Sequence, residues 1–129
     1  QYGHDIDVVY CENDNEAYGV TDALESAGYS VGSNINLGQV MVMSFDSTKN
    51  ALKMTLSGEI SVNTECNPLY GPVLTQMVQT LKKGGTLQRE TYIDEGQFSA
   101  MPGISSVYVD GLPYEVTQIT QKTLDGRKY

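Results

Sequence analysis

Polar side chains follow three strand-like runs of the sequence, at the point where each run ends: DVVYC at 7–11, VMVMSF at 40–45 and ISVNT at 60–64. The candidate ligand residues at these ends are Asn13, Asp14, Asp46, Glu65, Cys66 and Asn67. Open α/β sheets bind small ligands on the rim where their parallel strands end. Carboxylate oxygens accept hydrogen bonds from hydroxyl groups, and an amide both donates and accepts. These residue types therefore predict noncovalent binding of a sugar, with no bond made or broken.

Three of these candidates also stand where a helix needs an N-cap. Asp14, Asp46 and Asn67 each precede a helical pattern, and a cap residue contributes about 1 kcal/mol on its own. Their common position on one rim favours ligand contact, and a residue can fill both roles. Asn13 is not needed as a cap if Asp14 serves, so Asn13 and Asp46 are the strongest candidates.

The other two candidates have a structural alternative. Glu65 is equally compatible with a solvent-facing position on an edge strand. Cys66 is expected to be a small buried apolar residue rather than a reactive thiol, because no histidine or cationic residue lies near it in the sequence to activate it.

The composition limits the classes of function. A net charge of -8 over 129 residues opposes binding to phosphate backbones, so no nucleic-acid partner is expected. Cys11 and Cys66 have no spacing typical of a zinc site. They are predicted to be free thiols, because a third strand is expected between their two strands and would hold them too far apart to form a disulfide. No cofactor is expected, and neither a leader nor a membrane-spanning stretch is seen in these residues.

The periodicity of apolar residues predicts alternating strands and helices. Residues 6–11 and 40–45 are continuous apolar runs typical of strands buried on both faces, whereas 60–66 is more polar, as expected near a sheet edge or a crossover between lobes. Helices are predicted after Asp14, over 47–57 and from Asn67-Pro68 onward, and each is expected to end at a glycine: Gly28, Gly58 and Gly84. Beyond Thr86, β-prone pieces at 90–94 and 107–110 alternate with Gly-Pro turns.

This order of elements predicts the fold class α/β, a three-layer parallel-sheet (Rossmann-like) arrangement with right-handed crossovers. Three strands make a small parallel sheet. The opening residues QYGHD are typical of the end of a helix-to-strand turn. We therefore expect an incomplete lobe with strands missing upstream.

Three segments carry a more specific resemblance: DIDVVYCENDNEAYGVTDALESAGYSVG at 5–32, VMVMSFDSTKNALKMTLSGEI at 40–60, and SVNTECNPLYGP at 61–72. Together they resemble the C-terminal portion of ribose/galactose-type (type 1) periplasmic sugar-binding proteins of ABC importers. The Glu-x-x-Pro crossover, the Gly71-Pro72 pair and a C-terminal Tyr129 are most similar to galactofuranose-binding-like members.

The resemblance implies two α/β lobes that close on a monosaccharide, joined by three chain crossings. It implies that Asn13 and Asp14 contact sugar hydroxyls and that Asp46 is a further ligand residue. At the third crossing many members have a glutamine two positions before the proline. Cys66 stands there in this chain, between Glu65 and Asn67, and this departure is compatible with a different sugar.

The resemblance also implies an organisation for the chain. Residues 1–66 would be part of the C-terminal sugar-binding lobe, and 67–129 would be a crossover, a helix packing on an N-terminal lobe whose sequence is not here, and an irregular tail. The implied partners are a monosaccharide, a membrane permease and that N-terminal lobe. The parent protein would be periplasmic or extracellular, attached to the membrane by a lipid anchor. As a fragment, the chain is expected to self-associate through unpaired sheet edge.

Two other classes compete with this interpretation. An enzyme is not expected, because the only histidine is His4, and Asp14 with Asp46 would be the only acid pair available to a glycosidase. The effector-binding domain of a lactose-repressor-type transcription regulator has the same fold and similar rim residues. Its missing upstream part would include a helix-turn-helix. The negative net charge and the galactofuranose-like crossover favour the transporter over the repressor.

Overall fold

The computed structural model describes residues 5–129; residues 1–4, with His4 and the start of the predicted lobe, lie outside the described residues. The elements are β1 (Val8–Tyr10), α1 (Asp14–Ser26), β2 (Ser30–Val31), the 3-10 helix η2 (Ile35–Leu37), β3 (Gln39–Asp46), α2 (Lys49–Ser57), β4 (Val62–Glu65), α3 (Gly71–Lys82), β5 (Gln97–Ser99), β6 (Ser106–Val109), β7 (Leu112–Glu115), β8 (Thr117–Gln118) and α4 (Gln121–Gly126).

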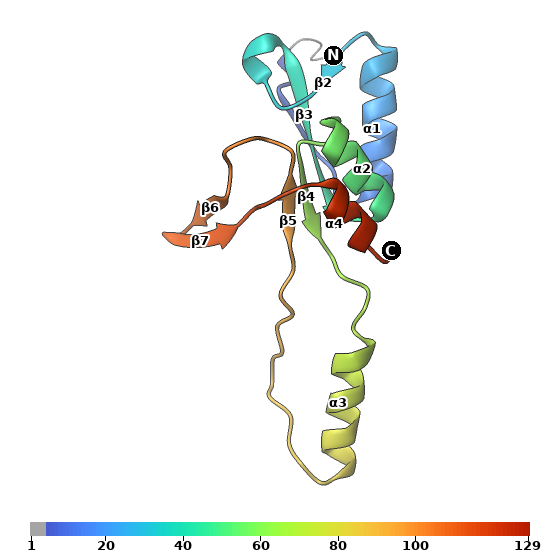
Figure 1. The fold of residues 1–129 in the computed structure, drawn as a ribbon, viewed down its shortest axis with the longest axis vertical. Helices are drawn as coiled ribbons and strands as arrows, with labels where there is room; N and C mark the ends of the chain where they lie inside the picture. The colour runs from blue at the N-terminus through green and yellow to red at the C-terminus, as the bar shows by residue number, and fades with distance from the viewer. Residues whose placement is uncertain (1–4) are drawn as a thin grey trace.

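The main sheet has the strand order β1-β3-β4-β5-β8, with β2 also paired to β3. Strands β1, β3 and β4 are parallel, which confirms the predicted α/β class. Strand β5 runs antiparallel to β4. Strand β4 lies between β3 and β5, so of the two positions predicted for this strand the sheet edge is wrong. The chain leaves the sheet directly after β4, toward α3 (Figure 1). The polar side chain of Asn63 on this strand is fully buried.

Helices α1 and α2 and the buried core lie on one face of the sheet. Ala17 of α1, Ala51 of α2 and Val42 of β3 belong to one buried core cluster, and the two helices lie on the same side of the sheet in Figure 1. On the other face, Val8 is 48% exposed and Tyr10 61% exposed. The described residues therefore form two of the three predicted layers. The prediction that β1 is buried on both faces is wrong, because no described helix covers its second face.

Glycines end three of the helices at the predicted positions. Gly28 follows α1 with φ 86°, Gly58 follows α2 with φ 92° and Gly84 follows α3 with φ 76°, a left-handed backbone that glycine adopts without steric penalty. The helix starts differ from prediction. Thr48 is the N-cap of α2. Helix α3 begins at Gly71 rather than at residue 68, because the Asn67 side chain accepts a hydrogen bond from the Leu69 N–H (2.8 Å) and holds a turn there.

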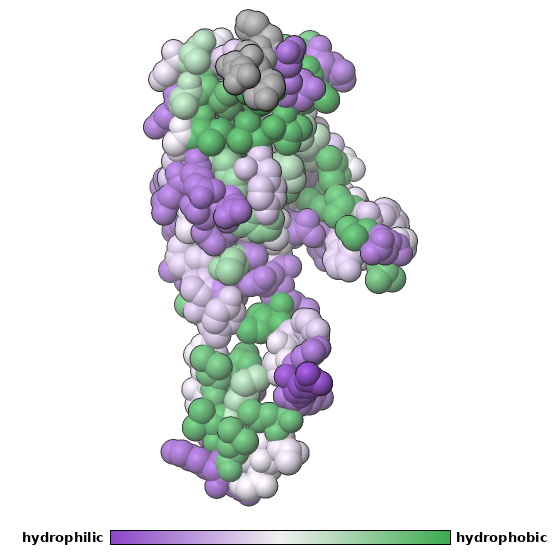
Figure 2. All heavy atoms as spheres, turned by 180° about the vertical axis from the view of Figure 1, so that it is seen from behind, coloured by the Kyte–Doolittle hydropathy of each residue, from purple (hydrophilic) through white to green (hydrophobic). Residues whose placement is uncertain are grey.

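Helix α3 projects away from the sheet, and an extended segment returns beside it (Figure 1). None of the α3 residues is buried. Its exposed apolar side chains include Leu74, Val78 and Leu81, and Figure 2 shows hydrophobic side chains gathered over this end of the molecule. The returning segment contains 90–94, where a strand is predicted, yet these residues form no strand. This prediction is wrong because the segment has no neighbouring strand with which to pair.

The tail is more ordered than expected. Strand β5 joins the sheet beside β4, β8 pairs with β5, and Leu124 of α4 joins a second core cluster with Leu52 and Phe98. Strands β6 and β7 form a separate antiparallel hairpin, which confirms the strand predicted near 107–110. The expectation of an irregular tail is corrected by these elements. Between residues 5 and 129, no helix has the length and apolar character that a bilayer crossing requires.

Candidate functional site

The parallel strands bring their polar ends to one rim of the sheet. Asp46 at the end of β3 pairs in register with Glu65 at the end of β4. The Cys11 N–H, just after β1, donates to the Met43 carbonyl (2.9 Å) and places the residues that follow beside the same rim. The predicted residues thus lie together at this rim, as the sequence pattern indicates, but their side chains have different hydrogen-bond partners.

Asn13 is the N-cap of α1. Its Oδ1 accepts a hydrogen bond from the Glu16 N–H at 3.0 Å, so the expectation that Asp14 would serve as the cap is wrong. The Asn13 side-chain NH₂ makes no hydrogen bond to any other residue between 5 and 129, and the residue is half-buried. An amide nitrogen in this position can donate to a hydroxyl group of a ligand.

Asp14 is buried, at 2% exposure, and its carboxylate is fully engaged by the protein. Oδ1 accepts from Ser44 Oγ (2.7 Å) and Asn63 Nδ2 (2.8 Å). Oδ2 accepts from the Thr48 N–H (2.8 Å) and Thr48 Oγ1 (2.7 Å). Two carboxylate oxygens offer about four acceptor sites, so no acceptor is left for a sugar. We therefore remove Asp14 from the contacting residues.

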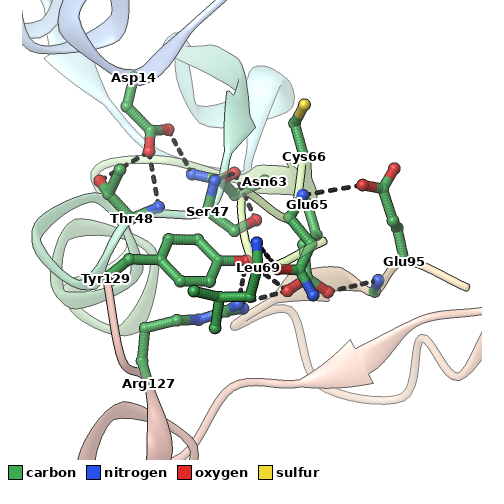
Figure 3. A network of polar contacts seen from close by, with 12 residues as sticks. Asp14, Ser47, Thr48, Asn63, Glu65, Cys66, Leu69, Glu95, Arg127 and Tyr129 are labelled. Carbon is green, nitrogen blue, oxygen red and sulfur yellow. Dashed lines mark hydrogen bonds and ion pairs between the residues drawn. The ribbon is translucent and has the colours of Figure 1, made fainter. Parts of the chain in front are cut away.

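The network continues from Asp14 to the turn after β3 (Figure 3). Asn63 is fully buried. Its Nδ2 donates to Asp14, and its Oδ1 accepts from both the N–H (3.0 Å) and the Oγ (2.8 Å) of Ser47. Sequence reasoning missed Ser44, Ser47, Thr48 and Asn63. The signal in the sequence was that Ser44 and Asn63 place polar side chains in strand-like runs, at positions where apolar residues are expected.

Asp46 has an unusual backbone and a free carboxylate. Its φ is 98°, and Ser47 follows with φ 55°. A non-glycine residue in this region costs about 1 to 3 kcal/mol, and such strain concentrates at functional sites. Within the described chain no hydrogen bond or ion pair reaches the Asp46 carboxylate, and the residue is half-buried. The helix-cap explanation for Asp46 is wrong, because Thr48 is the cap of α2.

Glu65 is paired with the C-terminal segment. Its Oε1 accepts from Arg127 Nη1 and from the Tyr129 hydroxyl, and its Oε2 accepts from the Gly96 N–H at 2.8 Å. Burial opposes ionisation, but the bonds from Tyr129, Gly96 and Arg127 outweigh it and hold the pKa of the Glu65 carboxyl below its usual value. The alternative of a solvent-facing residue on an edge strand is therefore wrong.

Arg127 is enclosed by aromatic rings as well as by this carboxylate. Its guanidinium carbon lies 5.0 Å from the Phe98 ring centre and 4.9 Å from that of Tyr129, within the range of cation–π attraction. Burial and the bond to Glu65 raise the pKa of the Tyr129 hydroxyl. The backbone oxygen of Tyr129 accepts from the Lys49 N–H (2.7 Å) in the first turn of α2. The C-terminal segment thus joins the end of β4 to the start of α2.

Cys66 and Asn67 begin the crossover toward α3. Cys66 is exposed, so the expectation of a buried residue is wrong; the chain leaves the sheet here and no described element covers it. Its Sγ lies 3.9 Å from the Tyr70 hydroxyl, and both cysteines are free thiols, as predicted. The Asn67 N–H donates to Glu95 Oε1 at 2.7 Å, which ties the crossover to the returning segment.

A pocket of about 410 Å³ lies beside this crossover, between Glu65, Asn67 and Tyr129. A larger hollow of about 630 Å³ lies at the opposite end of the sheet, between Gly32, Gly58 and Pro102. The larger hollow is away from the rim and from every predicted ligand residue. Over residues 5–129, no group of three or more His, Cys, Asp or Glu side chains is placed to hold a metal ion.

No family model matches the chain. The fructose import binding protein FruE of Bifidobacterium longum is 29% identical over 92 residues, which cover 71% of this chain and 26% of that protein. A crystal structure from Mycobacterium smegmatis in complex with β-D-fucofuranose superposes with a TM-score of 0.64 at 26% identity, covering 76% of this chain and 33% of that one. A galactofuranose binding protein superposes with a TM-score of 0.63 at 24% identity, covering 74% and 31%.

The chain therefore spans between a quarter and a third of the length of these proteins. These similarities confirm the resemblance to type 1 sugar-binding proteins. The chain is similar to type 1 periplasmic sugar-binding proteins of ABC importers, and it has the fold of part of one of their lobes.

Proposed function

We propose that this chain forms one wall of a cleft that binds a monosaccharide noncovalently, in the substrate-binding component of an ABC sugar importer. The observation that carries the proposal is the Asp46 carboxylate, which is unpaired in the described chain and held at φ 98° on the rim. A carboxylate accepts hydrogen bonds from two adjacent hydroxyl groups, and Asn13 offers an amide donor from the neighbouring strand end.

The sugar contacts in this proposal are Asp46 and Asn13, with Cys66 and Asn67 at the border of the cleft. Asp14 and Glu65 contribute indirectly, because their carboxylates bind the protein. The similar proteins are named for fructose import, for a β-D-fucofuranose complex and for galactofuranose binding. We therefore propose a monosaccharide in its furanose form as the ligand class.

The proposed organisation assigns residues 1–66 to the C-terminal lobe and the crossover with α3 to contact with the N-terminal lobe. The exposed apolar side chains of α3, such as Leu74 and Val78, support this assignment, as does the greater length of the similar proteins. The further proposed partner is a membrane permease. The proposed location is periplasmic or extracellular, with a lipid anchor in the parent protein.

The proposal involves no catalysis, and the named relatives are binding proteins. The repressor alternative is not favoured, because the similar proteins named for a function serve import or sugar binding. The noncovalent character of binding follows from the donors and acceptors at the rim, which match hydroxyl groups.

The test is a titration of the ¹⁵N-labelled chain with methyl β-D-galactofuranoside, whose ring cannot open, followed by amide chemical shifts. We expect the largest shifts at residues 13 and 46–48. Asp46→Asn should weaken binding about tenfold, since a hydrogen bond to a charged group contributes about 1.5 to 3 kcal/mol.

The matched control is Asp22→Asn, which changes an exposed aspartate on α1 and should leave the affinity unchanged. Asp46→Asn binding within threefold of the unmodified chain would remove Asp46 from the site, the threefold limit being about half of the smallest effect expected from a charged hydrogen bond. Shifts confined to the hollow between Gly32 and Gly58 would move the site to the other end of the sheet.

A further inference from the structure

We infer that Asn63 and Asp14 are positioning residues that hold the turn at Asp46–Ser47 in its left-handed conformation and so aim the Asp46 carboxylate at the rim. The inference rests on the proposed function in one respect, that Asp46 contacts the ligand. Neither residue touches the sugar in this arrangement. Each acts through the backbone of the turn.

The turn needs something to hold it. Asp46 and Ser47 both have a positive φ, 98° and 55°, a region that is unfavourable for residues with a Cβ atom. Glycine at either position would adopt it freely, yet neither is glycine. A conformation of this kind persists only where surrounding contacts determine it.

The contacts that determine it come from Asn63. Both donors of Ser47, its N–H and its Oγ, point at the single Oδ1 of Asn63, at 3.0 and 2.8 Å. Ser47 and Asn63 are both fully buried, so water does not replace these bonds. Losing the acceptor would leave two buried donors unsatisfied, and the turn could then relax.

Asp14 fixes which end of the Asn63 amide faces the turn. Asn63 Nδ2 donates to Asp14 Oδ1 at 2.8 Å; a flipped amide would present NH₂ to the Ser47 donors and oxygen to the Asp14 carboxylate. Asp14 Oδ2 also accepts from the N–H and Oγ1 of Thr48. The two residues that follow Asp46 are therefore both tied to one buried network, while the Asp46 carboxylate stays free.

The hydrogen-bonding chemistry of Asp14 and Asn63 suggests a test in which the two side-chain types are swapped. Asn63→Asp keeps an acceptor for Ser47 but loses the donor and places a second carboxylate against Asp14. The double variant Asp14→Asn/Asn63→Asp restores one donor and one acceptor across the contact, and the oxygen of the amide introduced at position 14 still accepts from Thr48. Ser44 can then accept from the NH₂ of that amide, because a hydroxyl group donates or accepts.

The readout is amide hydrogen exchange of Ser47 and Thr48 relative to Val42 in the core of β3. We expect Asn63→Asp to speed exchange at both amides about tenfold or more, and the double variant to return it to within about threefold. Thr55→Val is the control, because the Thr55 side chain is fully buried and its hydroxyl donates to the Ala51 carbonyl within its own helix. It should leave Ser47 and Thr48 unchanged.

The affinity for methyl β-D-galactofuranoside should follow the same order: lowered in Asn63→Asp and recovered in the double variant. If the unmodified chain does not bind this sugar, the proposed function fails, and the exchange data still decide whether the pair positions the turn. Unchanged exchange at Ser47 and Thr48 in Asn63→Asp would overturn the inference. Faster exchange with unchanged affinity would overturn the link to the ligand.

A milder variant keeps the test decisive if Asn63→Asp does not fold. Ser47→Ala removes only the hydroxyl bond to Asn63 Oδ1 and keeps the N–H bond. We expect exchange at residue 47 to quicken about threefold while Val42 stays protected. Unaltered exchange at residue 47 would contradict the inference.

Discussion

At the scale of single residues, similar side chains on one rim have different roles because their partners differ. Asp14 and Asp46 are both carboxylates at strand ends, but Asp14 accepts four hydrogen bonds from the protein and the Asp46 carboxylate accepts none from the described chain. The sequence shows both residues and predicts the rim. It does not show which is buried, because the partners Ser44 and Asn63 meet Asp14 only through the strand register.

Glu65 makes the stability of the fold depend on pH. The folded-state pKa of Glu65 lies below its usual value of 4.5, so its ionised form contributes stability above that value. This contribution is lost as the pH falls below 4.5 through the folded pKa. Glu65→Gln should lower the free energy of unfolding at pH 7 by about 1 kcal/mol and flatten its decline in acid.

Urea unfolding at pH 7 and at several values below the usual glutamate pKa of 4.5 checks this prediction. Glu59→Gln, which changes another glutamate after α2, is the control and should retain the acid dependence of the unmodified chain. An equally steep acid decline in Glu65→Gln would show that other carboxylates carry it.

At the scale of elements, agreement with prediction is best where the local sequence decides the structure. The apolar run at 40–45 became β3, and Gly28 and Gly58 ended their helices. The start of α3 could not be predicted, because Asn67-Pro68 is typical of a helix start but Asn67 forms a turn with Leu69. Strands β5 and β8 have three and two residues and depend on pairing with distant segments, so periodicity does not reveal them.

Two glycines in or after helices should respond oppositely to alanine. Gly19 lies within α1, and a Cβ atom there would meet nothing within 4 Å, so Gly19→Ala should stabilise the fold by about 0.5 to 1 kcal/mol. Gly58 has φ 92°, so Gly58→Ala should destabilise it by about 1 kcal/mol. Thermal unfolding of both variants measures this difference, and a lower midpoint for Gly19→Ala would contradict it.

At the scale of the whole molecule, the face of the sheet that no described helix covers is an exposed apolar surface. Val8 and Tyr10 of β1 are exposed there, and Tyr10 packs edge to face on Phe45 with ring centres 5.4 Å apart. Strand β1 also stands at one end of the strand order, so its outer edge has no partner strand among the described residues. An exposed apolar face next to an unpaired edge favours association with another chain.

The chain alone should therefore self-associate in a concentration-dependent way, and Tyr10→Lys should reduce this association. Sedimentation velocity over a range of protein concentrations is the measurement. Tyr92→Lys, at another exposed tyrosine that lies away from the sheet, is the control. A sharp monomeric species at all concentrations, with cooperative unfolding, would contradict the prediction.

The segment 66–95, which carries α3, leaves the sheet after Glu65 and returns to it at Gly96. These two residues are hydrogen-bonded to each other. The Glu65 N–H donates to the Gly96 carbonyl (2.8 Å), and the Gly96 N–H donates to Glu65 Oε2 (2.8 Å). In folding, β4 can pair with β5 only once residues 66–95 have closed into a loop, and this closure costs conformational entropy. The segment from β5 to α4 should thus join the sheet late, and a short turn in place of 66–95 would remove most of that delay.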